Sequence, residues 1–342
     1  MKILLVGVCD NEESTNYHQM VALRAMGHEV QPFNYRTEAN AASARGDTEG
    51  AAQVYRDVFD AFKPELVIFS KFDTWPTEAI RWSKSHGALT WYWYMDPLLF
   101  LTRGLVEHAK AADFVSCTGL GQTQFLRFWG ANAYHIFEGI NPDTYYPVEP
   151  SEELNTEVGF IGSKTDERLE LMRKLREADL DVTVSGPGWG ETSKMMGAEF
   201  YRLMCASARL MVGCDREIHT LGYFSDRVFR VMACGGVYVS RRIPLMESWF
   251  EDGKHLFLFD KDRDLVDFCV SAAKCEDLRD VREAARQHVI QNFTWRHSME
   301  RLVSIVNGET TNWTFDLAPS VLASSPPSGE KSEGWYTGPP VS

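Results

Sequence analysis

The stretch Val158–Arg168, which reads VGFIGSKTDER, decides the fold class of this chain. Its apolar first part, which ends at Ile161, predicts a buried strand, and the residues from Glu167 onward have the pattern of a helix. Gly162 stands between them and allows a tight turn. Because a strand, a short turn and a helix form the repeating unit of a parallel sheet, the stretch predicts an α/β fold.

The turn in this stretch also predicts an anion site. Gly162 and Ser163 are small enough for the backbone to approach a phosphate, and the following helix begins with free N–H groups and the positive end of its dipole. Lys164 and Arg168 add positive charge. An ordinary strand-to-helix turn with surface charges is the alternative interpretation, because glycine turns are common.

The same alternation of strand and helix extends over both halves of the chain. Strands are predicted over residues 2–8, 28–35, 66–70, 89–95, 114–118, 157–161, 182–185, 210–213, 236–240 and 256–259. Helices are predicted over residues 15–26, 48–62, 76–85, 167–178, 200–208, 225–233, 265–273, 278–291 and 295–306. A segment rich in proline and glutamate interrupts the pattern at 147–155. We therefore expect an N-terminal domain over 1–150 and a C-terminal domain over 151–306, whose last helix is a candidate to cross back to the N-terminal domain. The remaining residues, 307–342, are expected to form a largely flexible tail.

Composition limits the classes of function. The 342 residues carry a formal net charge of −13, which argues against a general nucleic-acid binder. The seven cysteines are odd in number and form no Cys-x-x-Cys pair, which is typical of reduced thiols. The N-terminal apolar run is too short for a signal peptide or a membrane span, so we expect a cytoplasmic protein without a membrane span.

A second stretch carries a family resemblance. Residues His219–Val239 read HTLGYFSDRVFRVMACGGVYV, a helix that ends in Ala-Cys-Gly-Gly and enters an apolar strand. This resembles the donor-site helix of GT-B glycosyltransferases, and most closely that of the CgeB-like branch of the group-1 glycosyltransferases. Gly253–Leu256, Phe293–Ser298 and, more weakly, Gly139–Pro147 resemble further segments of that family. The resemblance covers roughly residues 2–306 and is firmest in the second half.

The resemblance implies a fold and an activity. GT-B proteins have two Rossmann-like, doubly wound domains that face each other across a cleft. They move a sugar from a nucleotide-diphosphate sugar to an acceptor hydroxyl, with the nucleotide on the C-terminal domain, the acceptor on the N-terminal domain and no metal. We expect a UDP-sugar as the donor and no other cofactor. The implied donor-binding residues are Gly162, Ser163, Lys164, Arg168, Gly186, Trp189, Ser225, Asp226, Arg227 and Arg230.

Roles follow from side-chain chemistry. Arg227 is the first candidate for a diphosphate contact, because a guanidinium matches phosphate oxygens bidentately. Asp226 is a candidate for the ribose hydroxyls, and Trp189 for stacking on the base. Many retaining relatives have a Glu-x7-Glu pair, which here falls on Gly222 and Arg230. This departure leaves the ribose contact and the stereochemical outcome open, and a structural salt bridge is the alternative role for Arg230.

The catalytic candidates lie in the first half. Asp96 follows the strand Trp91–Met95 and is the best candidate to accept a proton from an acceptor hydroxyl, although a helix N-cap is an equal alternative. Met95 stands where some relatives have a histidine. Asp10 is a second-line candidate, and His18 fits a structural histidine better than a catalytic one.

Alternatives remain at this point. A sugar-nucleotide epimerase would need acids and histidines that we cannot assemble here, and a degenerate GT-B module would bind without turnover. The acceptor is open among a glycan, a protein, a metabolite and a hydroxymethylated DNA base. The last would need a basic patch, for which the N-terminal candidates are Arg24, Arg36, Lys71, Arg81, Lys84 and Arg103. The acidic triplets at Asp179–Asp181 and Asp260–Asp264 are interpreted as solvated turns, and no metal site is predicted.

Overall fold

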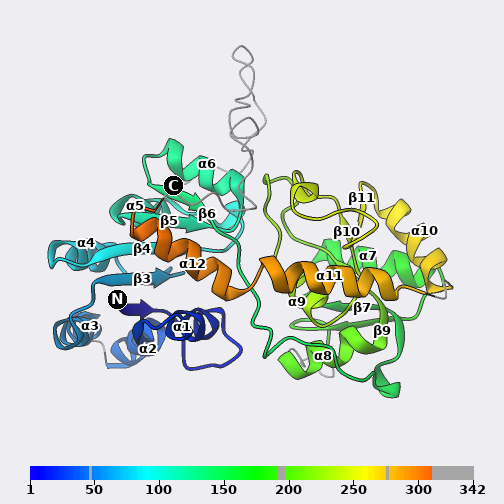
Figure 1. Cartoon of the computed structure of the whole chain (residues 1–342), viewed down its shortest axis with the longest axis horizontal. Helices are drawn as coiled ribbons and strands as arrows, with labels where there is room; N and C mark the ends of the chain where they lie inside the picture. Colours follow the sequence, from blue (N-terminus) through cyan, green and yellow to red (C-terminus); the bar gives the residue numbers. More distant parts are fainter. Residues whose placement is uncertain (46–47, 191–196, 275–276, 310–342) are drawn as a thin grey trace, which may run out of the picture.

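The chain folds into two parallel sheets with helices on both faces of each (Figure 1). The structure is a computed structural model that describes residues 1–45, 48–190, 197–274 and 277–309. The first sheet has six strands in the order β2-β1-β3-β4-β5-β6, and the second has five in the order β11-β10-β9-β7-β8. Every strand pairs in parallel with its neighbours. The predicted doubly wound α/β class is confirmed.

The N-terminal sheet contains β1 (Lys2–Val6), β2 (Glu29–Phe33), β3 (Leu66–Ser70), β4 (Leu89–Tyr94), β5 (Phe114–Cys117) and β6 (Ala133–His135). Its helices are α1 (Thr15–Ala25), α2 (Tyr35–Arg45), α3 (Thr48–Phe62), α4 (Glu78–Ser85), α5 (Arg103–Ala111) and α6 (Leu120–Phe128).

The C-terminal sheet contains β7 (Thr156–Ile161), β8 (Val182–Ser185), β9 (Ala208–Gly213), β10 (Tyr238–Arg241) and β11 (Phe257–Phe259). The helices that follow its strands are α7 (Asp166–Glu177), α8 (Ala198–Ser207), α9 (Arg227–Ala233) and α10 (Asp262–Ala273), and α11 (Arg279–Asn292) and α12 (Trp295–Val306) end the described chain.

Strand β4 shows why the first sheet is covered on both faces. Its side chains alternate across the sheet, as they do in any strand. Trp91 and Trp93 lie in the core beneath α1 and α12, whereas Tyr92 and Tyr94 lie in the opposite core with residues of α3, α4 and α5. All four rings are at most 2% exposed, so neither face of this strand meets solvent.

Four elements of the first half escape the sequence analysis: the helices α2, α5 and α6 and the strand β6. The sequence of α2 contains few apolar residues, so it offers no periodic stripe to detect. Strand β6 has only three residues, which is below the length at which alternation can be recognised. Helix α9 begins at Arg227 and not at Ser225.

Helix α12 belongs to the core of the first half although it ends the second. Trp295, Met299 and Leu302 pack in one cluster with β1 and α1, and Figure 1 shows α12 lying over the first sheet. A parallel bridge between Ile140 and Thr294 joins the two segments that run between the halves. The chain therefore passes from one half to the other at two adjacent points. The predicted boundary near residue 150 falls between β6 and β7.

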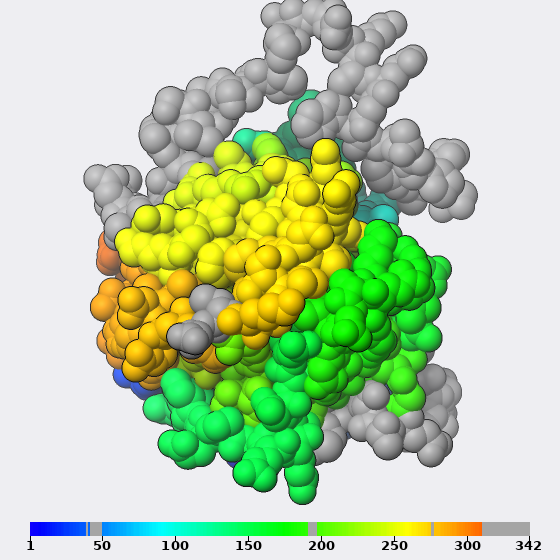
Figure 2. Space-filling view, turned by 90° about the vertical axis from the view of Figure 1, so that its right-hand side faces the viewer, coloured from blue at the N-terminus to red at the C-terminus, as the bar shows by residue number. Residues whose placement is uncertain are grey.

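The loops at the carboxyl ends of the two sheets meet. Gly121, which follows β5, donates its N–H to the carbonyl of Leu221, which follows β9, at 2.9 Å. A carboxylate oxygen of Glu13, which follows β1, accepts from the N–H of Ala198 at the start of α8, at 3.0 Å. Figure 2 views the molecule from the C-terminal half, whose surface consists of chain segments coloured green to orange. No helix within the described ranges is long and apolar enough to cross a membrane.

Candidate active site

The turn after β7 lies directly against the turn after β8. Gly162 donates its N–H to the Ser185 carbonyl at 2.8 Å, and its own carbonyl accepts from the Trp189 indole N–H at 2.8 Å. A Cβ on Gly186 would stand 2.4 Å from the Gly162 oxygen, so this approach requires glycine. The structure therefore brings Gly162, Gly186 and Trp189 together, as the sequence analysis expected of a donor site.

Two buried guanidinium groups lie beneath this turn. Arg168 donates to the carbonyl oxygens of Cys214 at 2.8 Å and Ser163 at 2.7 Å. Arg227 donates to the Ile161 carbonyl at 2.9 Å, and both guanidiniums lie within 5.4 Å of the centre of the Phe160 ring. Burial above all, and then the charge of Arg227, lower the pKa of Arg168.

Asp215 is a site residue that the sequence analysis missed. It follows β9, is 7% exposed and accepts from Arg227 at 2.8 Å. It also accepts from the Ser225 hydroxyl at 2.7 Å and from the Ser225 N–H at 3.1 Å. Ser225 and Arg227 are thus held by a carboxylate, and the position of Asp215 directly after an apolar strand was the signal that could have identified it. Asp215 pairs with Arg227, whereas the Arg168 guanidinium donates to backbone carbonyls beneath the turn.

Arg227 is less accessible than the sequence analysis expected. Its side chain is 10% exposed. Burial is the largest influence on its pKa and acts to lower it, but the charge of Asp215, together with those of Tyr201, Tyr238 and Asp226, raises the pKa above its usual value. A Cβ on Gly162 would meet its terminal nitrogen at 2.9 Å. Arg227 therefore supports the turn from below, while the exposed Lys164 lies above it with its ammonium 5.9 Å from the centre of the Trp189 ring. A base stacking on that face of Trp189 has to displace Lys164.

Asp226 and Arg230 form an ion pair one turn apart on α9. The Arg230 guanidinium lies 5.3 Å from the centre of the Tyr145 ring and 5.9 Å from that of Tyr201. The structural salt bridge weighed as an alternative for Arg230 is present, although it lies within one helix and not between domains.

On the facing edge of the N-terminal sheet, Asp96 follows β4 and pairs with Lys71, which follows β3, at 3.2 Å. The side chain of Asp96 is 41% exposed. The next short helix, Leu98–Phe100, has Pro97 and not Asp96 at its N-cap, and no side chain caps it. The capping interpretation of Asp96 is therefore wrong, which leaves its carboxylate for Lys71 and for a ligand.

Asp10 lies in the loop after β1, and His18 lies on the helix that follows this loop. Asp10 is exposed and accepts from the Asn34 amide at 2.7 Å. His18 is 3% exposed on α1, and neither ring nitrogen has a hydrogen-bond partner among the described residues. Burial and the charge of Arg230 lower its pKa to about 4, so the imidazole is neutral at neutral pH.

Comparison with known proteins relates this chain to a family and to solved structures. Residues 166–304 match the model of a family described as glycosyl transferase-like. The chain is similar to sucrose-phosphate synthase from Thermosynechococcus elongatus, with 12% identity, 90% of this chain and 98% of that one covered, and a TM-score of 0.60. It is similar to HepE from Anabaena, solved with UDP-glucose, with 14% identity, 90% and 100% covered, and a TM-score of 0.61. The chain has the GT-B fold. The predicted resemblance to GT-B glycosyltransferases is confirmed.

Two further findings complete the comparison of this GT-B chain with known proteins. A glycosyltransferase from Rickettsia africae is similar at 12% identity, with 90% of this chain and 98% of that one covered and a TM-score of 0.61. No match is found among curated proteins. The narrower resemblance to the CgeB-like branch stays a prediction.

Glu138 is a second residue of the GT-B interdomain region that the sequence analysis missed. It follows β6, in the segment that leads to the second half. Burial raises its pKa well above the usual range, and the charges of Asp226, Arg230 and Lys71 also act on it. This carboxyl therefore lies where residues of both halves come together. The apolar neighbour Phe137 and the glycine after Glu138 gave no catalytic signal in the sequence.

Four of the six basic residues proposed for a nucleic-acid patch lie beside acidic residues. Arg81 pairs with Glu78 at 3.2 Å, and Lys84 pairs with Asp113 at 2.6 Å, both from α4. Arg24 donates to the Val30 carbonyl, Arg36 faces Asp73, Lys71 faces Asp96, and Arg103 starts α5. The basic patch stays a prediction, although acids pair with most of these cations. Among the described residues, no three metal-binding side chains of the usual kinds lie close enough to hold an ion.

Proposed function

We propose that this protein is a glycosyltransferase that moves a sugar from a UDP-sugar to an acceptor hydroxyl. One observation carries the proposal: the Gly162 turn, with Arg168 and Arg227 buried beneath it, belongs to the sheet whose carboxyl ends meet those of the sheet that bears Asp96. The Gly162 turn with its two buried arginines fits an anionic diphosphate, and the Asp96 carboxylate fits a proton transfer. Two similar structures are described as complexes with UDP and glucose or with UDP-glucose.

The proposed reaction forms a bond between the acceptor oxygen and the anomeric carbon of the sugar. The bond between that carbon and the diphosphate oxygen breaks, and UDP leaves with the electron pair. The proton of the acceptor hydroxyl passes to the Asp96 carboxylate. Whether configuration at the anomeric carbon is kept or inverted depends on the face of the sugar that the acceptor attacks.

Charge on the leaving diphosphate needs compensation. The N–H groups at the start of α7 and the buried cations Arg168 and Arg227 supply it in this proposal, and Lys164 adds an exposed ammonium. These groups support a mechanism in which the chain itself balances the charge, without a metal. We assign Arg227 to holding the turn and Ser163 and Lys164 to ligand contact. The buried thiols of the six described cysteines fit a reducing compartment, so we also propose a cytoplasmic location.

Calorimetry with UDP and UDP-glucose, together with assays of UDP release, tests the proposal. UDP should bind saturably, and UDP-glucose should release UDP slowly in water and faster with an acceptor. Asp96→Asn should bind UDP as the wild type does and lose about 10²- to 10⁴-fold in transfer, because a proton acceptor is removed. Asp60→Asn, on the exposed face of α3, is the matched control and should keep full activity. Full transfer by Asp96→Asn would remove Asp96 from the chemistry.

A degenerate GT-B module is the second candidate, and Arg230 favours it. An arginine paired with Asp226 occupies the place where many relatives have a glutamate. Saturable UDP binding without release of UDP from UDP-glucose, GDP-glucose or TDP-glucose would decide for the module.

A further inference from the structure

The turn after β3 has an unusual backbone. Lys71 and Phe72 both adopt the left-handed conformation, with φ of 62° and 55°. Residues with a Cβ avoid this region, and glycine takes it without strain. Two such residues in succession at the carboxyl end of a central strand indicate that the side chains themselves are needed.

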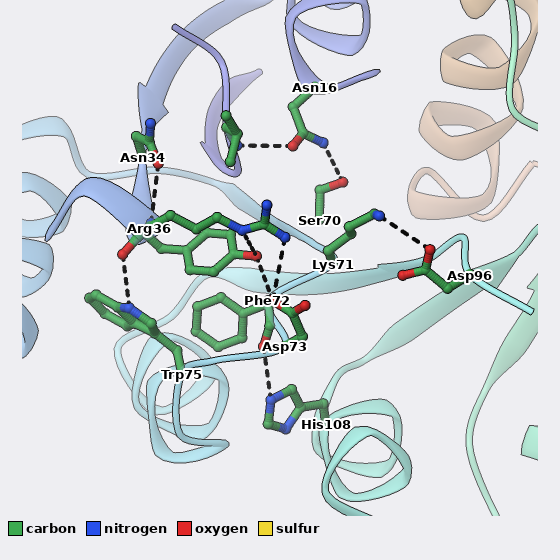
Figure 3. A network of polar contacts seen from close by, with 12 residues as sticks. Asn16, Asn34, Arg36, Ser70, Lys71, Phe72, Asp73, Trp75, Asp96 and His108 are labelled. Atoms are coloured by element: carbon green, nitrogen blue, oxygen red, sulfur yellow. Dashed lines mark hydrogen bonds and ion pairs between the residues drawn. The ribbon is translucent and has the colours of Figure 1, made fainter. Parts of the chain in front are cut away.

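Buried contacts hold this turn in place (Figure 3). Phe72 is fully buried and packs on Phe69 with ring centres 4.8 Å apart. Its carbonyl accepts from His108 Nε2 at 3.1 Å, and the Lys71 N–H donates to the Trp93 carbonyl at 3.0 Å. The strained conformation is therefore fixed from three sides, while the Lys71 side chain remains outside the core.

The conformation directs the Lys71 ammonium to Asp96. The two groups are 3.2 Å apart and 35% and 41% exposed, and Figure 3 shows the lysine extended toward the carboxylate. An ion pair with this exposure contributes little to stability. The strain at the turn is therefore not offset by the salt bridge it forms, which points to a role in ligand binding.

The same edge of the sheet has little spare positive charge. Arg36 lies 3.6 Å from Asp73, and the Tyr35 hydroxyl donates to that carboxylate at 2.9 Å. Asp10 accepts from Asn34. Three carboxylates thus face two cations at this edge, which disfavours a phosphorylated acceptor and suits the hydroxyls of a neutral one.

We propose that Lys71 is a positioning residue for transfer, which holds Asp96 and donates to a neutral, polyhydroxylated acceptor such as a sugar. The inference rests on the proposed glycosyl transfer. Lys71 acts through its side chain. A substitution by glycine removes that side chain and also relieves the backbone strain, so it should reduce transfer without reducing stability.

Lys71→Gly is the decisive variant, with glucose as the acceptor probe and UDP-glucose as the donor. We expect its Tm to stay within about 2 °C of the wild type or to rise, because glycine adopts this backbone freely. UDP release in the presence of glucose should fall about 100-fold while the affinity for UDP is unchanged, since a misplaced carboxylate slows the transfer step. Lys71→Arg should recover part of the loss.

Lys63→Gly is the matched control. Lys63 is also left-handed, with φ of 53°, and it is exposed at the opposite end of the same strand, before β3. The same substitution there should leave both UDP affinity and transfer unchanged. Equal transfer by Lys71→Gly and the wild type would overturn the inference while the proposed function stands. A wild type that neither binds UDP nor releases it would overturn both.

Glucose 6-phosphate tests the acceptor class. Both cations at this edge are already paired with carboxylates, so no cation is left for the phosphate of glucose 6-phosphate, and that phosphate would meet a carboxylate without compensation. Wild-type transfer to glucose should therefore exceed transfer to glucose 6-phosphate by about tenfold or more. A preference for the phosphorylated sugar would contradict the neutral acceptor.

Discussion

At the residue scale, several polar atoms of buried side chains have no hydrogen-bond partner among the described residues. His18 is an example: it lies between Tyr17 and Tyr145, with ring centres 6.0 and 6.2 Å away, and both of its nitrogens are unpaired in the described structure. Such groups carry a desolvation cost that surface residues avoid. His18 therefore carries this desolvation cost at a position where the charges of Arg230 and Asp226, from the other half, act on it.

His18 predicts a pH dependence of stability. Its pKa is about 4 in the folded protein and 6.5 in the unfolded chain, so between these values the unfolded chain binds a proton that the folded one does not. The free energy of unfolding should therefore be highest above pH 6.5 and fall by up to about 3 kcal/mol as the pH drops to 4.

Urea denaturation across this pH range measures the effect of His18. His18→Gln should flatten the slope, because glutamine does not titrate. His219→Gln, at an exposed histidine, should leave the slope as it is. A His18→Gln protein with the wild-type slope would assign the dependence to other buried histidines, such as His135, whose pKa burial lowers to about 3.

At the element scale, the donor side depends on how closely two strand-to-helix turns approach. The turns after β7 and β8 touch through backbone atoms, and Trp189 fastens one to the other through its indole N–H. A parallel sheet brings the carboxyl ends of neighbouring strands side by side, but only residues without a Cβ permit this contact.

Two glycines of the second turn separate close approach from backbone strain. Gly186 and Gly190 have almost the same φ, 131° and 132°. A Cβ at Gly186 would meet the Gly162 oxygen at 2.4 Å, whereas a Cβ at Gly190 would meet none of the described residues within 4 Å. Gly186→Ala should therefore cost about 1–3 kcal/mol more stability than Gly190→Ala, as overpacking does.

Chemical denaturation of both alanine variants measures this difference in the free energy of unfolding. Calorimetry measures their affinities for UDP. Gly186→Ala should also weaken UDP binding, because the new Cβ would push against the Gly162 carbonyl and displace the turn after β7. Equal losses of stability in the two variants would show that strain alone, and not the contact between turns, makes glycine necessary.

At the scale of the whole molecule, the two halves are joined by short polar contacts as well as by the two chain crossings. Glu13, from the loop after β1, accepts the N–H of Ala198 and so caps α8, a helix of the other half. Gly197, which occupies the N-cap position of α8, has no side chain to do so. This contact fixes the distance between the donor and acceptor edges.

Glu13→Ala tests the contact. Loss of a cap costs about 1 kcal/mol, so the variant should unfold at lower urea concentration and sample a wider separation of its halves. Small-angle scattering should give a larger radius of gyration than for the wild type. Glu12→Ala, at the exposed neighbouring residue, is the control and should match the wild type in both measurements. An unchanged radius in Glu13→Ala would mean that the crossings and contacts such as the Gly121–Leu221 hydrogen bond hold the halves without Glu13.

The periodic strands and the glycine turns make the architecture predictable from the amino-acid sequence alone. Strand β3, helix α3 and helix α12 begin and end where the sequence predicts, because apolar runs and a flanking proline or glycine mark them. The positions of Gly162, Gly186 and Trp189 in the turns after two strands were also predicted from the sequence, whereas their role in donor binding stays a prediction. These features are local, so one stretch of sequence contains all the information that they need.

Tertiary structure decided what each charged residue does. Sequence cannot show that Arg227 is buried against Asp215, that Lys71 reaches Asp96, or that Glu138 meets groups from both halves, because each pairing joins residues from separate elements. The same holds for the basic residues predicted to form a nucleic-acid patch, where ion pairs such as Lys84 with Asp113 join residues that are distant in sequence. The chain by itself determined the sheets and the edges at which we propose that ligands bind, and the packing of those edges against each other determined which side chains remain available for chemistry.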